Sequence, residues 1–130
     1  KLLGGVDYIF TEIAAQGLDG KVFVVVASDF GRGPHYNGTG TGSGKDHWPI
    51  TSLFAAGPGI QGNRVIGATD AATQKAKSID PASLQPVDGE GGVRLDPSRI
   101  HLALRKLAGL EGSEVAGKFP LVGETLPLFG

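Results

Sequence analysis

The chain contains an unbroken apolar run that ends at a glycine-rich polar loop. Val22 to Ala27 read VFVVVA, with Gly20 shortly before them and Ser28 and Asp29 after them. A strand with one face in water alternates apolar and polar residues. A continuous run of β-branched and aromatic residues is instead typical of a strand buried on both faces in a parallel sheet. Ligands of open α/β sheets bind beyond the carboxyl ends of such strands. The loop that follows is therefore the first place to look for function.

A helix is expected before this strand. Val6, Ile9 and Ile13 recur at helical spacing, and Gly17 is a C-terminal stop signal. A helix, a short turn and a parallel-type strand form half of a βαβ unit, and the strand that begins such a unit is not in the sequence. We therefore expect residues 1–130 to be the C-terminal portion of one larger α/β domain.

Further elements are expected after the loop. A second buried strand is expected at Ile50–Gly57, and two short alternating segments at Arg64–Ala68 and Ala76–Ile79 could pair as a hairpin or as edge strands. Asp96 is expected to cap a helix whose first residue is Pro97. The stretch Phe119–Phe129 is expected to form short edge strands or a docking tail. This pattern predicts an α/β fold with helices flanking buried strands.

Composition excludes several classes of function. The 12 basic and 13 acidic residues leave a net charge of −1, and no basic run interleaves with aromatic residues, so nucleic acid is not an expected partner. The apolar runs are far shorter than a membrane span. The absence of cysteine excludes disulfides and thiolate metal sites.

Three side chains of the loop are candidate metal ligands. Asp29 lies at the carboxyl end of the predicted strand, where a carboxylate could hold a hard divalent cation such as Zn, Ca, Mg or Mn together with imidazole ligands. His47 and His35 are the nearest imidazoles along the chain. A turn-capping aspartate and two ordinary loop histidines are the alternative interpretation.

Arg32 and Lys45 are candidate contacts for an anionic substrate. Arginine grips a phosphate or sulfate with two parallel hydrogen bonds, whereas lysine acts as a point charge. Two surface cations with no ligand are the alternative. The glycine-rich stretch Gly38–Gly44 is not a phosphate-binding P-loop, because Lys45 is followed by Asp46 rather than by serine or threonine.

Three segments carry a resemblance to a known superfamily. They are VVVASDFGR (Val24–Arg32), GKDHWPITSLFAAGPGIQG (Gly44–Gly62) and LDPSRIHLALRKLAGL (Leu95–Leu110). In this order they resemble the C-terminal half of the alkaline phosphatase superfamily, which includes the sulfatases. They resemble more closely a group of exported bacterial sulfatase-like proteins of unknown function. The resemblance implies the C-terminal part of an alkaline-phosphatase-like sandwich with mainly parallel strands.

The resemblance also implies a function, with one departure from the pattern. The parent protein would be a metal-dependent hydrolase of phosphate or sulfate esters, and it would be periplasmic or exported. Asp29, His47 and His35 would be metal ligands. Arg32 and Lys45 would bind the substrate, an anionic small molecule or glycan. The superfamily has a second ligand after the aspartate, where this chain has a phenylalanine. The nucleophile would lie in the N-terminal half of the domain, the expected structural partner, so these residues alone would be inactive. The alternative hypothesis is a sulfatase-like binding or scaffold protein without catalysis.

Overall fold

The computed structural model describes all 130 residues, and the chain divides into two compact units, Lys1–Gly62 and Asn63–Gly130. Unit 1 contains one helix and four strands: α1 (Leu2–Ala15), β1 (Val24–Ala27), β2 (Gly31–Tyr36), β3 (Lys45–Trp48) and β4 (Leu53–Ala56). Unit 2 contains two short strands and two helices: β5 (Ser78–Ile79), β6 (Pro86–Val87), α2 (Pro97–Leu107) and α3 (Glu114–Lys118). No helix combines the length and the apolar character that a membrane span requires.

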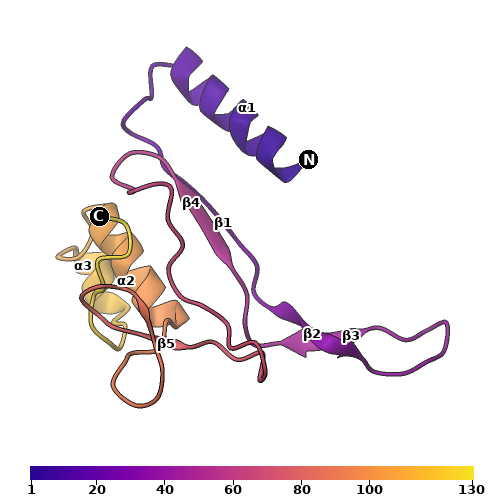
Figure 1. Cartoon of the computed structure of the whole chain (residues 1–130). Coiled ribbons are helices and arrows are strands. Elements are labelled where there is room, and N and C mark those ends of the chain that lie inside the picture. Colours follow the sequence, from indigo (N-terminus) through magenta and orange to yellow (C-terminus); the bar gives the residue numbers. More distant parts are fainter. The chain divides into compact units, whose positions relative to one another are not determined.

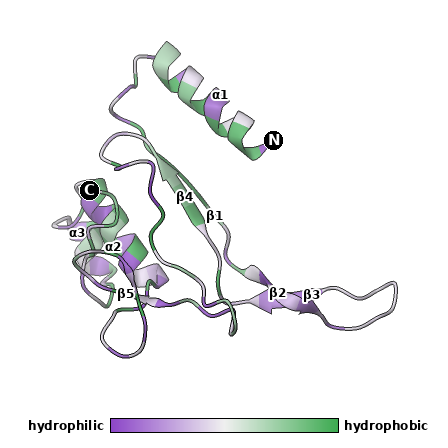
Figure 2. Ribbon diagram, in the orientation of Figure 1, coloured by the Kyte–Doolittle hydropathy of each residue, from purple (hydrophilic) through white to green (hydrophobic).

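The strands of unit 1 form two nested antiparallel pairs. β1 pairs with β4, from Val24 opposite Ala56 to Ala27 opposite Leu53, and β2 pairs with β3 between them. The chain thus runs out along β1 and β2, turns at residues 37–44, and returns along β3 and β4 (Figure 1). Hydropathy changes along this ribbon, from apolar at β1 and β4 to hydrophilic at β2 and β3 (Figure 2).

The predicted parallel sandwich is wrong. Every sheet of the structure is a two-stranded antiparallel pair, and the run that suggested a parallel strand becomes β1, whose residues Val24 to Val26 are only half-buried. An apolar run indicates burial but says nothing of strand direction. Here the connection between β1 and β4 is a hairpin, which reverses the chain, and not the helical crossover that a parallel pair needs.

The ends of the two long helices follow the sequence signals. Gly17, with φ +66°, donates to Ala14, and the next backbone N–H, that of Leu18, donates to Ile13. Asp96 caps the start of α2 by accepting from the backbone N–H of Arg99 at 2.9 Å. Glycine in the left-handed region closes one helix and a carboxylate opens the other, as the sequence predicts.

The core lies in unit 2. Its buried apolar residues are Ile79, Leu84, Ala103, Leu126, Leu128 and Phe129, whereas unit 1 buries only Val6. The predicted strands in the C-terminal stretch do not form, and the alternative, a docking tail, is what the structure shows. Arg64 also holds this tail by donating to the Leu128 carbonyl at 2.9 Å. Arg64–Ala68 is not a strand. The predicted segment at Ala76–Ile79 instead contributes β5, which pairs with β6.

Candidate anion-binding face of the hairpin

The β2–β3 hairpin places basic and aromatic side chains opposite one another. Arg32 lies opposite His47 and Tyr36 lies opposite Lys45, with an irregularity in β2 between the two rows. Lys45 and His47 are two residues apart on β3, so their side chains leave the same face of the ribbon. This face, made of Phe30, Arg32, Tyr36, Lys45 and His47, is called the basic face below.

Ring contacts organise the basic face. The Phe30 and His47 rings stack with centroids 3.7 Å apart and an interplanar angle of 17°. The Arg32 guanidinium lies 5.1 Å from the centroid of the Phe30 ring, and the Lys45 ammonium lies 5.4 Å from that of Tyr36. Both distances fall within the range of a cation–π contact. The aromatic rings therefore hold the two cations without neutralising their charge.

Neither cation of this face has a carboxylate partner. Arg32 donates from Nη1 to the Lys45 carbonyl at 2.9 Å, and neither residue takes part in an ion pair. The nearby Asp46 leaves the opposite face of β3, where it accepts from the side-chain amide of Asn37 at 2.9 Å. The positive charges of Arg32 and Lys45 are therefore not neutralised by an ion pair within the chain.

The structure does not gather the predicted metal ligands into a site. Asp29 is exposed in the bend between β1 and β2, His35 is exposed on β2, and His47 is stacked on Phe30. No three histidine or acidic side chains of the chain are grouped so that they could hold a metal ion. Of the five predicted site residues, the fold brings together Arg32, Lys45 and His47.

Two residues of the basic face were not predicted as contributors. In the sequence, Phe30 stands out only as a phenylalanine at the position of a metal ligand, and Tyr36 carries no motif. A signal for Tyr36 was available, because an aromatic residue near the end of a strand and a lysine at the start of the next are favourably placed to pair across a hairpin. The Phe30–His47 stack depends on the register of the two strands, which no local pattern specifies.

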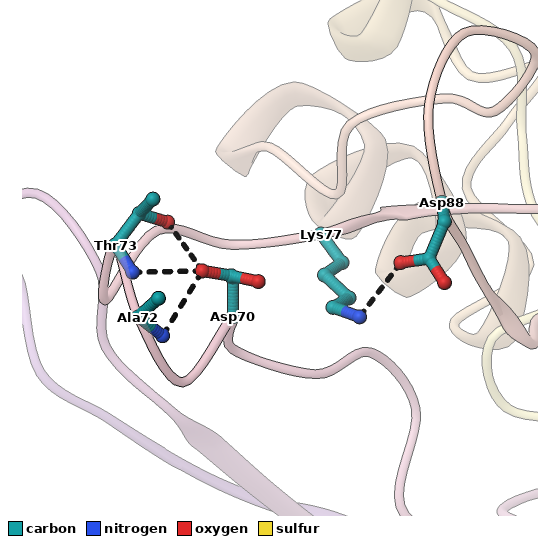
Figure 3. A network of polar contacts seen from close by, with 5 residues as sticks. All are labelled: Asp70, Ala72, Thr73, Lys77 and Asp88. Carbon is teal, nitrogen blue, oxygen red and sulfur yellow. Dashed lines mark hydrogen bonds and ion pairs between the residues drawn. The ribbon is translucent and has the colours of Figure 1, made fainter.

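Sequence reasoning also missed a repeated turn in unit 2. Asp70 accepts at Oδ1 from the backbone N–H of Ala72 and from both the N–H and the hydroxyl of Thr73 (Figure 3). Ten residues later Asp80 accepts in the same way from Ala82 and Ser83. The recurrence of Asp-x-Ala-Thr/Ser was the available signal.

These hydrogen bonds perturb the charged groups of the repeat. The backbone N–H and then the hydroxyl of Thr73 lower the pKa of Asp70, and those of Ser83 lower the pKa of Asp80. Between the two turns, Lys77 donates to Asp88 at 2.7 Å, and this hydrogen bond raises the pKa of the ammonium (Figure 3). In each turn the three hydrogen bonds converge on one oxygen, Oδ1 of the aspartate, and this oxygen fixes the local conformation of its own turn.

Comparison with known proteins gives one match. A family described as "Protein of unknown function (DUF1501)" matches residues 3–85. No curated protein and no solved structure matches. The predicted membership of the alkaline phosphatase superfamily is therefore wrong: the family that matches is DUF1501, and no sulfatase or alkaline phosphatase family is identified.

The family match does not test several of the predictions made from the sequence. Ester hydrolysis, the divalent metal ion, the glycan or parent-domain partner, and export stay predictions. The match extends from the first turn of α1 through the basic face to the second aspartate turn, and it covers more than half of the chain. The chain belongs to the DUF1501 family of proteins of unknown function.

Proposed function

We propose that this chain is a binding module whose basic face recognises an oxyanion, a phosphate, sulfate or carboxylate group, of its ligand. One observation carries the proposal: Arg32 and Lys45 project from one face of the hairpin and neither is paired with a carboxylate. A guanidinium that keeps free N–H donors can grip two oxygens of one anion, and a neighbouring ammonium adds a second charge.

The aromatic contacts favour binding over a purely structural role for these cations. Each cation lies against a ring, Arg32 against Phe30 and Lys45 against Tyr36, so part of its conformational freedom is already lost before a ligand arrives. Such pre-organisation lowers the entropic cost of binding. Tyr36 is 68% exposed, so its ring is also accessible to the non-charged part of a ligand.

The proposal is tested by titrating the chain with sodium sulfate and with sodium phosphate at constant ionic strength, followed by amide chemical shifts. The expected result is that shifts concentrate in β2 and β3. Arg32→Gln and Lys45→Gln should each weaken sulfate binding about fivefold to tenfold, the loss expected when one charge-assisted hydrogen bond is removed. Lys21→Gln is the control, because it removes the same charge from an exposed position of unit 1 outside the hairpin.

Two results would contradict the proposed anion binding at the basic face. One is an equal effect of all three substitutions, which would indicate general charge attraction screened by salt. The other is a set of chemical shifts that leaves the hairpin unaffected.

A further inference from the structure

The tip of the hairpin carries an asparagine followed by glycine. Asn37 directly follows β2, Gly38 is the next residue of the turn, and both are exposed. We propose that Asn37 is a site of spontaneous deamidation, and that the hydrogen bonds of the hairpin set its rate. This inference is independent of anion binding.

The reaction needs only water. The backbone nitrogen of Gly38 attacks the side-chain carbonyl carbon of Asn37, the bond from that carbon to Nδ2 breaks, and ammonia leaves with the proton that the Gly38 nitrogen loses. Water then opens the five-membered imide at either carbonyl. Opening at one carbonyl gives aspartate, and opening at the other gives isoaspartate, in which the main chain runs through the former side chain.

The local structure leaves the attacking nitrogen accessible. The Gly38 N–H makes no hydrogen bond, and glycine has no Cβ to hinder the approach. A Cβ at this position would meet only the Ser43 side chain, at 2.9 Å from Oγ. The other asparagine of the chain, Asn63, is followed by the bulky Arg64 and serves as an internal reference.

Three hydrogen bonds restrain Asn37, whose side-chain amide must react. The Asn37 backbone N–H donates to the Gly44 carbonyl, the Gly44 N–H donates to Asn37 Oδ1, and Asn37 Nδ2 donates to Asp46 Oδ1, each at 2.9 Å. While these hold, the side chain is directed across the hairpin toward β3 and away from the next residue. Deamidation therefore proceeds through local opening of the tip, whose population sets the rate.

The product opposes the closed tip. A carboxylate at position 37 replaces the donor that Asp46 accepts from, so two like charges come within hydrogen-bond distance of one another. Isoaspartate also lengthens the main chain at the residue that pairs with Gly44. Deamidation should therefore convert a closed tip into an open one and should not reverse.

The experiment is incubation of the full chain at mildly alkaline pH, with peptide mass spectrometry and separation of aspartate from isoaspartate. Conversion is expected at Asn37 and not at Asn63. Asp46→Ala should accelerate it about tenfold, because one charge-assisted hydrogen bond restrains the amide. Gly38→Ala should slow it severalfold. Asn37→Asp, made directly, should increase hydrogen exchange at the Gly44 amide.

Each part of the deamidation proposal has a result that would contradict it. The proposal fails if Asn37 stays intact while a short Asn-Gly peptide of the same sequence converts completely under the same conditions, or if Asn63 converts as fast. Unchanged or slower conversion in Asp46→Ala would overturn the restraining role of Asp46. Unchanged exchange at Gly44 in Asn37→Asp would overturn the opening of the tip.

Discussion

Single carboxylates hold the repeated turns of unit 2 together. Asp70 and Asp80 each accept three hydrogen bonds at one oxygen, and these bonds favour the ionised form of the side chain. Leu84, which closes the second turn with φ +61°, is also 6% exposed and belongs to the core. The second turn thus links a surface carboxylate to the packing of unit 2.

This arrangement predicts a loss of stability in acid. The pKa of each aspartate is lower in the folded chain than the ordinary value of about 3.9. The stabilisation from ionisation is therefore complete above that value, and it is lost as pH falls through the lower folded pKa. Urea unfolding followed by circular dichroism should show a lower free energy of unfolding below about pH 4.

The double variant Asp70→Asn, Asp80→Asn is the control for this prediction. An amide oxygen can still accept hydrogen bonds but does not titrate in this range. The variant should be less sensitive to acid than the unmodified chain. Identical pH profiles for the two proteins would assign the acid sensitivity to other carboxylates.

The hairpin depends on a position where only glycine fits. Gly31 begins β2 opposite Trp48, and a Cβ built on it would collide with the carbonyl oxygen of Ile50. That oxygen belongs to the backbone, so it cannot rotate away as a flexible side chain could. Gly31 therefore lets the start of β2 approach the backbone of Ile50, two residues after the end of β3.

Gly31→Ala should therefore destabilise the hairpin by about 1–3 kcal/mol, the usual cost of forcing extra volume into a packed site. Trp48, the only tryptophan, lies directly across from this residue and makes its fluorescence a suitable probe of urea unfolding. Gly42→Ala is the matched control, because a Cβ there meets nothing within 4 Å and the backbone φ is unexceptional. Equal midpoints for the two variants would contradict the steric argument.

At the scale of the whole molecule, the two units differ in how much core they possess. Six of the seven buried apolar residues belong to unit 2, where Ile79 is fully buried. Unit 1 leaves large apolar side chains of α1 exposed, among them Leu2 at 62% and Leu3 at 71%. Burial of apolar surface is the main favourable term in folding, so the units should differ in autonomy.

We expect residues 63–130 to fold alone and residues 1–62 not to do so. Thermal unfolding of each piece, followed by circular dichroism, should be cooperative only for the first. Ile79→Ala should lower the stability of residues 63–130 by about 2–5 kcal/mol, as for other large-to-small substitutions in a core. A helical, cooperatively melting 1–62 piece would contradict this difference.

Features that depend on neighbouring residues could be predicted from the amino-acid sequence. The end of α1 at Gly17 and the start of α2 at Asp96 and Pro97 follow from backbone conformation and local hydrogen bonds, which act within one helical turn. The chemistry of Arg32 and Lys45 also predicts anion contacts, and that role stays a prediction.

The direction and register of the strands, in contrast, follow from contacts between segments that are distant in the chain. An apolar run such as that of β1 reports burial, and the same run serves a parallel or an antiparallel strand. The register, with Arg32 opposite His47, then determines which side chains meet, and His47 stacks on Phe30. The cross-strand partners of this hairpin lie between 9 and 17 positions apart in the chain, so their meeting depends on the whole hairpin and not on any local pattern.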